Sequence, residues 1–310
     1  MDAIFVGIDV SKDRLDVHVC PSGEAFAVTR DGKGLEELID RLRILAPQLI
    51  AIEATGGFET IAAAALAGAA LPLAIVNPAQ VRHFARAIGK LAKTDPIDAA
   101  VIARFAEAVK PEVRPLPDAQ ARLLGELVAR RRQIVEMMVA ERQREQRTAI
   151  ARVRKSILRH IKMLEKELAE IDNDVGTLVR GSPAWRDKED LLVSFPGIGN
   201  TLARTLLAEM PELGSLMRRE IACLAGVAPF TRQSGRWKGK SMIAGGRAPV
   251  RTALYMAALS AITYNPPLKR FYQRLLSVGK PKMLALIAVA RKILITLNAM
   301  LRERKQWQTA

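Results

Sequence analysis

The sequence predicts an α/β region followed by a mainly helical region, and three observations lead to this class. Short apolar runs that alternate with polar residues, or end on one, recur over residues 4–76 and are typical of β-strands. Segments with the three-and-four spacing of amphipathic helices lie between the later strands. After residue 118 the spacing is helical over most of the remaining chain. Three strands in succession, followed by alternating helices and strands, favour a ribonuclease H-like mixed sheet.

The predicted elements follow one another closely. The strands are expected at Ile4–Asp9, Arg14–Cys20, Glu24–Arg30, Leu49–Glu53 and Leu71–Val76, with a hairpin turn at residues 10–13 between the first two. Helices are expected at Gly34–Leu45 and Phe58–Leu66. Asn77-Pro78 and Thr94-Asp95-Pro96 should open two further helices, because a polar N-cap followed by proline is typical of a helix start.

Composition divides the rest of the chain. The proline-rich segment Lys110–Asp118 reads as a linker, and residues 119–178 contain no proline. A heptad-like apolar seam predicts a long helical hairpin or coiled coil that oligomerises, with members Ile150, Val153, Ile157, Ile161, Leu164, Leu168, Ile171, Val175 and Leu178. We therefore predict domains at 1–118, 119–182 and 183–310.

Charge differs strongly among these domains. The 310 residues carry a net charge of +16, and the sequence pI is about 10.3. Residues 1–118 are slightly acidic, with 13 Lys and Arg against 16 Asp and Glu, whereas residues 183–310 have 21 against 7. A chain this basic indicates a polyanionic partner and favours nucleic acid.

The cysteine pattern and the hydropathy argue against a cysteine-ligated metal site, a signal peptide and a membrane span. The two cysteines, Cys20 and Cys223, form no metal-binding pattern and fit a reducing cytoplasm. Asp2 and Asp9 interrupt the first apolar stretch, so no signal peptide is expected. The longest uncharged run, 61–76, is too short for a membrane span and contains a proline, so no membrane association is expected.

Four carboxylates near the N-terminus predict a metal site. Asp9 and Glu53 end predicted strands, and Asp95 and Asp98 share a face at a helix start. Converging carboxylates repel unless a cation neutralises them, and Mg²⁺ or Mn²⁺ prefers oxygen ligands. Asp9 alone could be a turn residue, and Asp95 and Asp98 could stabilise a helix start, whereas a buried strand end at Glu53 needs no acid. The opening at residues 7–11 also resembles the first phosphate loop of actin-like sugar kinases, with residues 54–57 as a weak second loop.

Two basic-region segments predict nucleic-acid binding. The turn at residues 196–199 resembles a helix-hairpin-helix, and we assign phosphate contacts to Gly197 and Gly199. Residues 231–240 then combine cations, glycines and an aromatic residue, which is typical of a phosphate track with base stacking. The predicted contacts in and after this track are Arg232, Arg236, Trp237, Lys238, Lys240, Arg247 and Arg251. A solvated basic loop is the ordinary alternative.

The same track contains Ser234, and neighbouring residues do not decide whether this serine is a nucleophile. None of the three histidines, His18, His83 and His160, is nearby in sequence to act as its base. Arginines or a metal site would have to activate the hydroxyl, and a structural or phosphate-binding serine is the simpler interpretation.

Motifs in order along almost the whole chain resemble a known family. The matching segments are Gly7-Ile8-Asp9-Val10-Ser11-Lys12, Ile52-Glu53-Ala54-Thr55-Gly56, Lys93-Thr94-Asp95-Pro96-Ile97-Asp98-Ala99, Pro196-Gly197-Ile198-Gly199 and the stretch from Gly226 to Tyr255. They resemble the DEDD transposases of bacterial insertion sequences, relatives of the Piv DNA invertase, described as bridge-RNA-guided recombinases. Ala244 departs from the serine common in the family.

The resemblance implies a function and a set of roles. It maps the acidic tetrad onto Asp9, Glu53, Asp95 and Asp98, and the nucleophile onto Ser234. It implies Mg²⁺-dependent cutting and rejoining of donor and target DNA through a serine–DNA intermediate. It also implies a structured guide RNA, dimers that assemble into tetramers, and a cytoplasmic, nucleoid-associated location.

Two other functions remain open at this stage. A hydrolytic junction nuclease would use the same tetrad with water as nucleophile. A nucleic-acid architectural protein would bind DNA without needing the metal.

Overall fold

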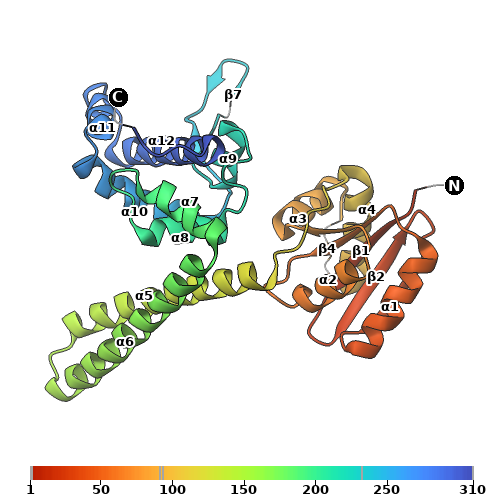
Figure 1. The fold of residues 1–310 in the computed structure, drawn as a ribbon. Coiled ribbons are helices and arrows are strands. Elements are labelled where there is room, and N and C mark those ends of the chain that lie inside the picture. The colour runs from red at the N-terminus through yellow and green to blue at the C-terminus, as the bar shows by residue number, and fades with distance from the viewer. Residues whose placement is uncertain (1–2, 91, 93, 232, 309–310) are drawn as a thin grey trace. The chain divides into compact units, whose positions relative to one another are not determined.

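The computed structural model describes residues 3–90, 92, 94–231 and 233–308, and the chain divides into two compact units. Unit 1 is Met1–Leu116 and unit 2 is Pro117–Ala310. The predicted hairpin and the predicted C-terminal domain thus lie in a single unit (Figure 1).

Unit 1 contains a five-stranded mixed sheet. Its strands are β1 (Phe5–Val10), β2 (Arg14–Cys20), β3 (Ala25–Thr29), β4 (Leu49–Glu53) and β5 (Leu73–Val76). Their spatial order is β3-β2-β1-β4-β5. β1, β2 and β3 pair in antiparallel fashion, and β4 and β5 join parallel to β1. The predicted strands and the α/β class are confirmed.

Helices cover both faces of this sheet, as the alternation of strand residues requires. The helices of unit 1 are α1 (Gly32–Leu45), α2 (Glu59–Gly68), α3 (Pro78–Ala87) and α4 (Asp95–Val109). Val6, Ile8 and Val10 pack in a core with α1 and α2. The alternate residues, such as Phe5, pack in a second core with α3 and α4.

The predicted helix starts are correct, but their caps differ. The Asn77 side chain accepts a 2.8 Å hydrogen bond from the amide of Ala79 at the start of α3. Thr94 precedes α4 without such a bond, so proline and the acids of the first turn mark that start instead.

Unit 2 begins with the predicted helical hairpin. Residues 110–118 have no regular structure, after which α5 (Ala119–Arg147) and α6 (Ala151–Gly181) pack along one another. The α6 seam is buried at Ile161, Leu164 and Val175, but Ile150 is 64% exposed and Val153 is 44% exposed. The facing end of α5, residues 142–147, is entirely polar, so the first turn of α6 has no apolar surface to pack against.

The rest of unit 2 is mainly helical, as predicted. Its helices are α7 (Pro183–Val193), α8 (Asn200–Glu209), α9 (Arg218–Leu224), α10 (Ala248–Tyr264), α11 (Pro266–Ser277) and α12 (Lys282–Glu303). α12 is long and apolar enough to cross a membrane by length and composition. Its residues Val289, Ile293 and Leu297 are nevertheless fully buried in the core shared with α8, α9 and α10. The composition of α12 is thus that of a core helix.

The basic segment after α9 forms short strand pairs. β6 (Pro229–Phe230) pairs with β9 (Met242–Ile243), and β7 (Gln233–Ser234) pairs with β8 (Trp237–Lys238), all antiparallel. What reads in sequence as a loop is therefore a β-hairpin that extends from the helical core (Figure 1).

Candidate functional site

Asp9 and Glu53 lie at the ends of two adjacent parallel strands. β1 and β4 pair with Phe5 opposite Leu49 and Gly7 opposite Ala51. Continuing this offset by one pair brings Asp9 beside Glu53, and alternation puts both on the face covered by α4. Both side chains are partly buried. The sheet therefore brings together the first two predicted acids.

A glycine lets the helix that carries the other two acids lie against this face. A Cβ on Gly7 would fall 2.2 Å from the backbone nitrogen of Ala103 and 2.3 Å from the carbonyl oxygen of Ala99. No side chain fits in that gap, so α4 rests directly on the backbone of β1. Gly7 points to the same face as Asp9, two residues further on. The beginning of α4 is thereby held over the end of β1.

The two acids of α4 act electrostatically on Asp9. Burial is the largest cause that raises the pKa of Asp9, and the negative charges of Asp98 and then Asp95 raise it further, to about 6. Both acids belong to the first turn of α4, where Asp95 is exposed and Asp98 is partly buried. Charges felt in this way lie close together, so Asp9, Asp95 and Asp98 share one electrostatic environment.

A fifth acid belongs to this neighbourhood and is missing from the prediction. Asp16 on β2 pairs directly with Asp9 across the sheet and is only 5% exposed. Its charge also raises the pKa of Asp9, and Arg14 forms a two-point ion pair with it. In sequence, Asp16 stands between Leu15 and Val17 as an ordinary polar residue of an alternating strand, and only the pairing of β2 with β1 brings it beside Asp9.

The donor set fits a hard divalent cation, although the acids do not form a closed cage. All the candidate ligands are carboxylate oxygens, the chemistry that Mg²⁺ and Mn²⁺ prefer. Within the described residues, no three His, Cys, Asp or Glu side chains are grouped closely enough to hold a metal ion. Burial and, after it, the charges of Asp98 and Asp95 raise the pKa of Asp9, and a bound cation would stabilise its ionised form against both.

The loop after Glu53 argues against the sugar-kinase alternative. The Glu59 carboxylate accepts hydrogen bonds from the amides of Thr55 (3.0 Å) and Gly57 (2.8 Å) and from the Thr55 hydroxyl (3.1 Å). Burial opposes the ionised form of Glu59, but these bonds and one from its own amide hold its pKa below the usual value. Amides that a phosphate loop would offer to a nucleotide are thus already occupied by an internal carboxylate.

Ser234 lies in unit 2 at the end of the β-hairpin. It pairs with Trp237 across a two-residue turn formed by Gly235, with φ of +55°, and Arg236. Ser234, Gly235 and Arg236 are all exposed. No hydrogen bond to the Ser234 hydroxyl occurs in the part of the chain that the structure describes. Further down the hairpin, the Ser241 hydroxyl lies 3.0 Å from that of Thr231.

The two glycines of the predicted phosphate-binding turn differ in role. The turn joins α7 to α8, as predicted for a helix-hairpin-helix, and the Ile198 amide donates to Phe195 within it. Gly197 has φ of +95°, and a Cβ there would lie 2.8 Å from the Ala261 Cα of α10. Gly199 is exposed, and a Cβ there would meet nothing. Packing therefore explains Gly197, whereas Gly199 leaves the start of α8 accessible.

Two predicted nucleic-acid contacts make internal bonds. Both terminal nitrogens of Arg247 donate to Glu212 at 2.7 Å, and one also donates to the Glu209 carbonyl at 2.6 Å. Arg251 donates to the carbonyl of Gly245 at 2.7 Å. These bonds fix the start of α10, so they give both arginines a structural role whatever else they bind.

The remaining predicted contacts belong to the β-hairpin. Arg236 and Lys240 are exposed there. Arg232 lies outside the described residues, as do the side chains of Trp237 and Lys238.

Comparison with known proteins identifies the family. Residues 6–149 match the family model of the DEDD transposases of IS110, and residues 189–273 match that of the IS116/IS110/IS902 family of transposases. The chain belongs to the IS110 family of transposases. It is thus a DNA transposase or recombinase, as the sequence motifs imply.

Similar proteins extend over the whole chain. The pilin gene-inverting proteins of Moraxella bovis and Moraxella lacunata are each 27% identical over 98% of both chains. A 42 kDa protein of insertion element IS900 from Mycobacterium paratuberculosis is 31% identical over 47% of this chain and 38% of its own. The similarity to an inverting protein is therefore end to end.

Proposed function

We propose that this IS110-family chain is a metal-dependent recombinase of an insertion sequence that cuts and rejoins DNA through Ser234. One observation carries the proposal: Asp9 is the last residue but one of the central strand β1, and the charges of Asp98 and Asp95 help to raise its pKa. A partly buried cluster of acids on a nucleic-acid enzyme favours a divalent cation as its ligand.

The sheet supports a ribonuclease H-like, RuvC-like assignment of unit 1. Three antiparallel strands followed by two parallel strands, with acids at the ends of the two central ones, agree with that class. We propose Asp9, Glu53, Asp95 and Asp98 as ligands of Mg²⁺ or Mn²⁺. When bound, such ions neutralise charge that develops on the reacting phosphate.

Ser234 is the proposed nucleophile. Its Oγ attacks a DNA phosphorus, the Oγ–P bond forms, the P–O bond to a deoxyribose oxygen breaks, and that oxygen takes up the proton that the serine loses. Attack by a new deoxyribose hydroxyl reverses the exchange, so the number of phosphodiester bonds is conserved. Exposure at the tip of a hairpin supports this role, because a rigid DNA backbone can reach a serine there.

The proposed partners follow from the family and the charge. They are donor and target DNA, a structured guide RNA, and further copies of the chain that assemble from dimers into tetramers. The acidic site of one subunit and the serine of another would then complete a site together. Action on chromosomal DNA would place the protein in the bacterial cytoplasm, at the nucleoid.

A denaturing gel tests the nucleophile. Full-length protein is incubated with Mg²⁺, labelled donor and target DNA and the noncoding RNA transcribed beside the gene. We expect a covalent protein–DNA adduct that Ser234→Ala abolishes. Ser241→Ala is the matched control, because it makes the same change on the same hairpin and should retain the adduct. Normal cutting and rejoining by Ser234→Ala would exclude the serine mechanism.

The acidic site is tested in the same assay. Asp9→Asn should abolish the adduct, and Asp13→Asn, an exposed aspartate in the turn after β1, should leave it intact. Equal activity of both variants with wild type would show that the acids are structural.

A hydrolytic junction nuclease remains the second candidate. It is favoured by the absence of any described side chain that activates Ser234 by a hydrogen bond. Water would then attack the phosphate, and the same gel would show free DNA ends without an adduct. Binding that is indifferent to Mg²⁺ and to Asp98→Ala would instead indicate an architectural protein.

A further inference from the structure

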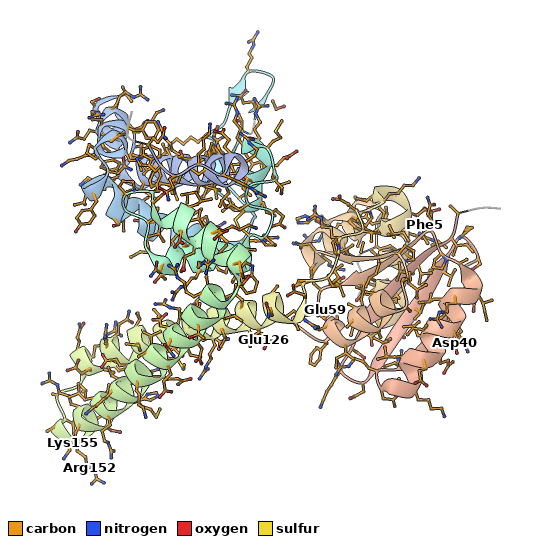
Figure 2. The ribbon with its side chains drawn as sticks, viewed as in Figure 1. Phe5, Asp40, Glu59, Glu126, Arg152 and Lys155 are labelled. Atoms are coloured by element: carbon orange, nitrogen blue, oxygen red, sulfur yellow. The ribbon has the colours of Figure 1, made fainter. Side chains whose placement is uncertain are left out.

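A row of cations follows the face of α6 that points away from α5. Arg152, Lys155, Arg159 and Lys162 recur at steps of three, four and three, so they lie on one side of the helix. Leu164, which packs in one cluster with Ile134 and Met138 of α5, lies on the other side, as does the buried Ile161. All four cations are exposed, and Figure 2 shows Arg152 and Lys155 at the end of the hairpin where α6 begins. We call these four residues the α6 stripe.

Four other arginines of the hairpin show what the stripe lacks. Acids lie opposite them: Arg130 pairs with Glu167 at 2.6 Å, Arg131 with Asp172 at 2.6 Å, Arg142 with Glu165 at 3.1 Å and Arg154 with Glu145 at 2.8 Å. Among the described residues, no ion pair is formed by any member of the α6 stripe. Acids of the facing helix therefore balance these four arginines, whereas the α6 stripe has no such partner among the described residues.

The distribution of charge along α6 is opposite to what a helix favours. Residues 151–166 contain six Lys and Arg against one acid, and residues 167–181 contain one against four. A helix is stabilised by acids near its N-terminus and by cations near its C-terminus. Adjacent members of the stripe also repel, at about 0.2–0.5 kcal/mol for each pair. The arrangement is unfavourable for the isolated helix and becomes favourable only when an anion lies against it.

The spacing fits a nucleic-acid backbone. Ten residues of helix separate Arg152 from Lys162, which is a distance of about 15 Å. One strand of duplex DNA carries about four phosphates over that length. The N-terminus of α6 has no side-chain cap, so its free amides add to the same positive field.

We propose that the α6 stripe binds the phosphate backbone of a nucleic-acid duplex. One face of α6 then packs against α5, and the opposite face binds nucleic acid. This contact is independent of Ser234 and of any metal, so it stands or falls separately from the recombinase mechanism. DNA and a folded RNA present the same backbone chemistry, and the test distinguishes them.

The salt dependence of binding tests the proposal. The dissociation constant of the full-length protein is measured from about 50 to 200 mM salt, once with a 30-base-pair DNA duplex and once with an RNA duplex of equal length. Each phosphate contact contributes about 0.9 to the slope of log K against log salt on DNA. For Arg152→Gln/Lys155→Gln/Arg159→Gln we expect a slope smaller by about 2.7. Wild type should therefore lose about 40-fold more affinity than the variant over that range.

The chain offers a matched control on α1. Lys33→Gln/Arg41→Gln/Arg43→Gln removes the same residue types and the same charge from exposed positions. It should leave the slope within one contact of wild type. A smaller slope for the α6 triple variant with DNA, with RNA or with both supports the proposal and identifies the duplex that the stripe binds. Equal slopes for the two triple variants would overturn the proposal. It would also be overturned if the α6 variant changed only the self-association of the protein, as measured by sedimentation.

A second measurement needs no variant. Amine-reactive labelling of wild-type protein should slow at Lys155 and Lys162 when the duplex is present, and it should continue unchanged at Lys33 and Lys110. Unchanged labelling at Lys155 and Lys162 with both duplexes would contradict the proposal even if a variant misfolds.

Discussion

Gly7→Ala should disable the acidic site without touching any of its carboxylates. The new Cβ would lie 2.2 Å from the Ala103 nitrogen and 2.3 Å from the Ala99 oxygen, whereas ordinary contact begins near 3.4 Å. α4 must therefore withdraw from the sheet by about 1 Å, because both clashing atoms are backbone. Overpacking of this kind costs about 1–3 kcal/mol of stability.

The displaced helix carries Asp95 and Asp98 away from Asp9. A displacement of about 1 Å at a reacting centre can reduce the rate 100-fold. We expect Gly7→Ala to lower DNA cleavage by about that factor while the protein remains folded. The pKa of Asp9, followed by carbon NMR in the absence of metal, should fall from about 6 towards its usual value as the two neighbouring charges recede.

Gly68→Ala is the control in the same unit, because a Cβ at that position meets no atom within 4 Å. It should leave cleavage and the melting temperature close to wild type. Wild-type cleavage by Gly7→Ala, at unchanged melting temperature, would refute the argument that this glycine sets the distance between α4 and β1.

Three further predictions concern stability. Because the folded pKa of Asp9 lies near 6 and its ordinary value is 3.8, ionised Asp9 opposes folding above about pH 6, and this penalty disappears as the pH falls from 6 to 4. In EDTA at pH 7.5, Asp9→Asn should therefore raise the unfolding free energy by about 1 kcal/mol after allowance for partial solvent screening, as measured by thermal melting. Glu189→Ala should lower the unfolding free energy by about 3–5 kcal/mol in urea, because Glu189 is fully buried and pairs with Arg204 at 2.7 Å. Gly197→Ala should cost about 2 kcal/mol in the same measurement, since its φ of +95° and the nearby α10 backbone both exclude a side chain.

Each of these has a matched comparison. Asp13→Asn should leave the pH dependence of the unfolding free energy unchanged. If Asp9→Asn showed the same pH dependence as wild type, the acidic cluster would not be the cause of that dependence. Glu165 forms a half-exposed ion pair, so Glu165→Ala should lower the unfolding free energy by less than about 1 kcal/mol. Equal losses for Glu165→Ala and Glu189→Ala would mean that the burial of Glu189 does not matter. Gly199→Ala should be nearly neutral for stability, so equal costs at Gly197 and Gly199 would contradict the distinction between them.

Much of unit 1 could be predicted because its signals are local. Strand alternation, the Asn77-Pro78 helix start and the turn after Asp9 are set by neighbouring residues, and all three are confirmed. The transposase family and enzyme class, inferred from ordered motifs, are confirmed as well. The metal, the serine intermediate, the guide RNA and the individual site residues remain predictions.

What could not be predicted depends on contacts between distant segments. Asp16 becomes a neighbour of Asp9 only because β2 pairs with β1 in one register. The seam of α6 continues to Ile150 in sequence, but its burial stops earlier, because the end of α5 is polar. The role of Arg247 depends on Glu212, which is 35 residues away in the chain.

The pairing of β1 with β4 makes strand register a requirement of the proposed chemistry. A one-residue insertion within Phe5–Ile8 or Leu49–Ile52 would turn Asp9 or Glu53 to the opposite face of the sheet, into the apolar core beneath α1 and α2. The segment between these strands can change length without moving either acid. We therefore expect natural length variation in the family to collect in the turns between Val10 and Gln48, while the two strand segments tolerate substitutions but not insertions or deletions.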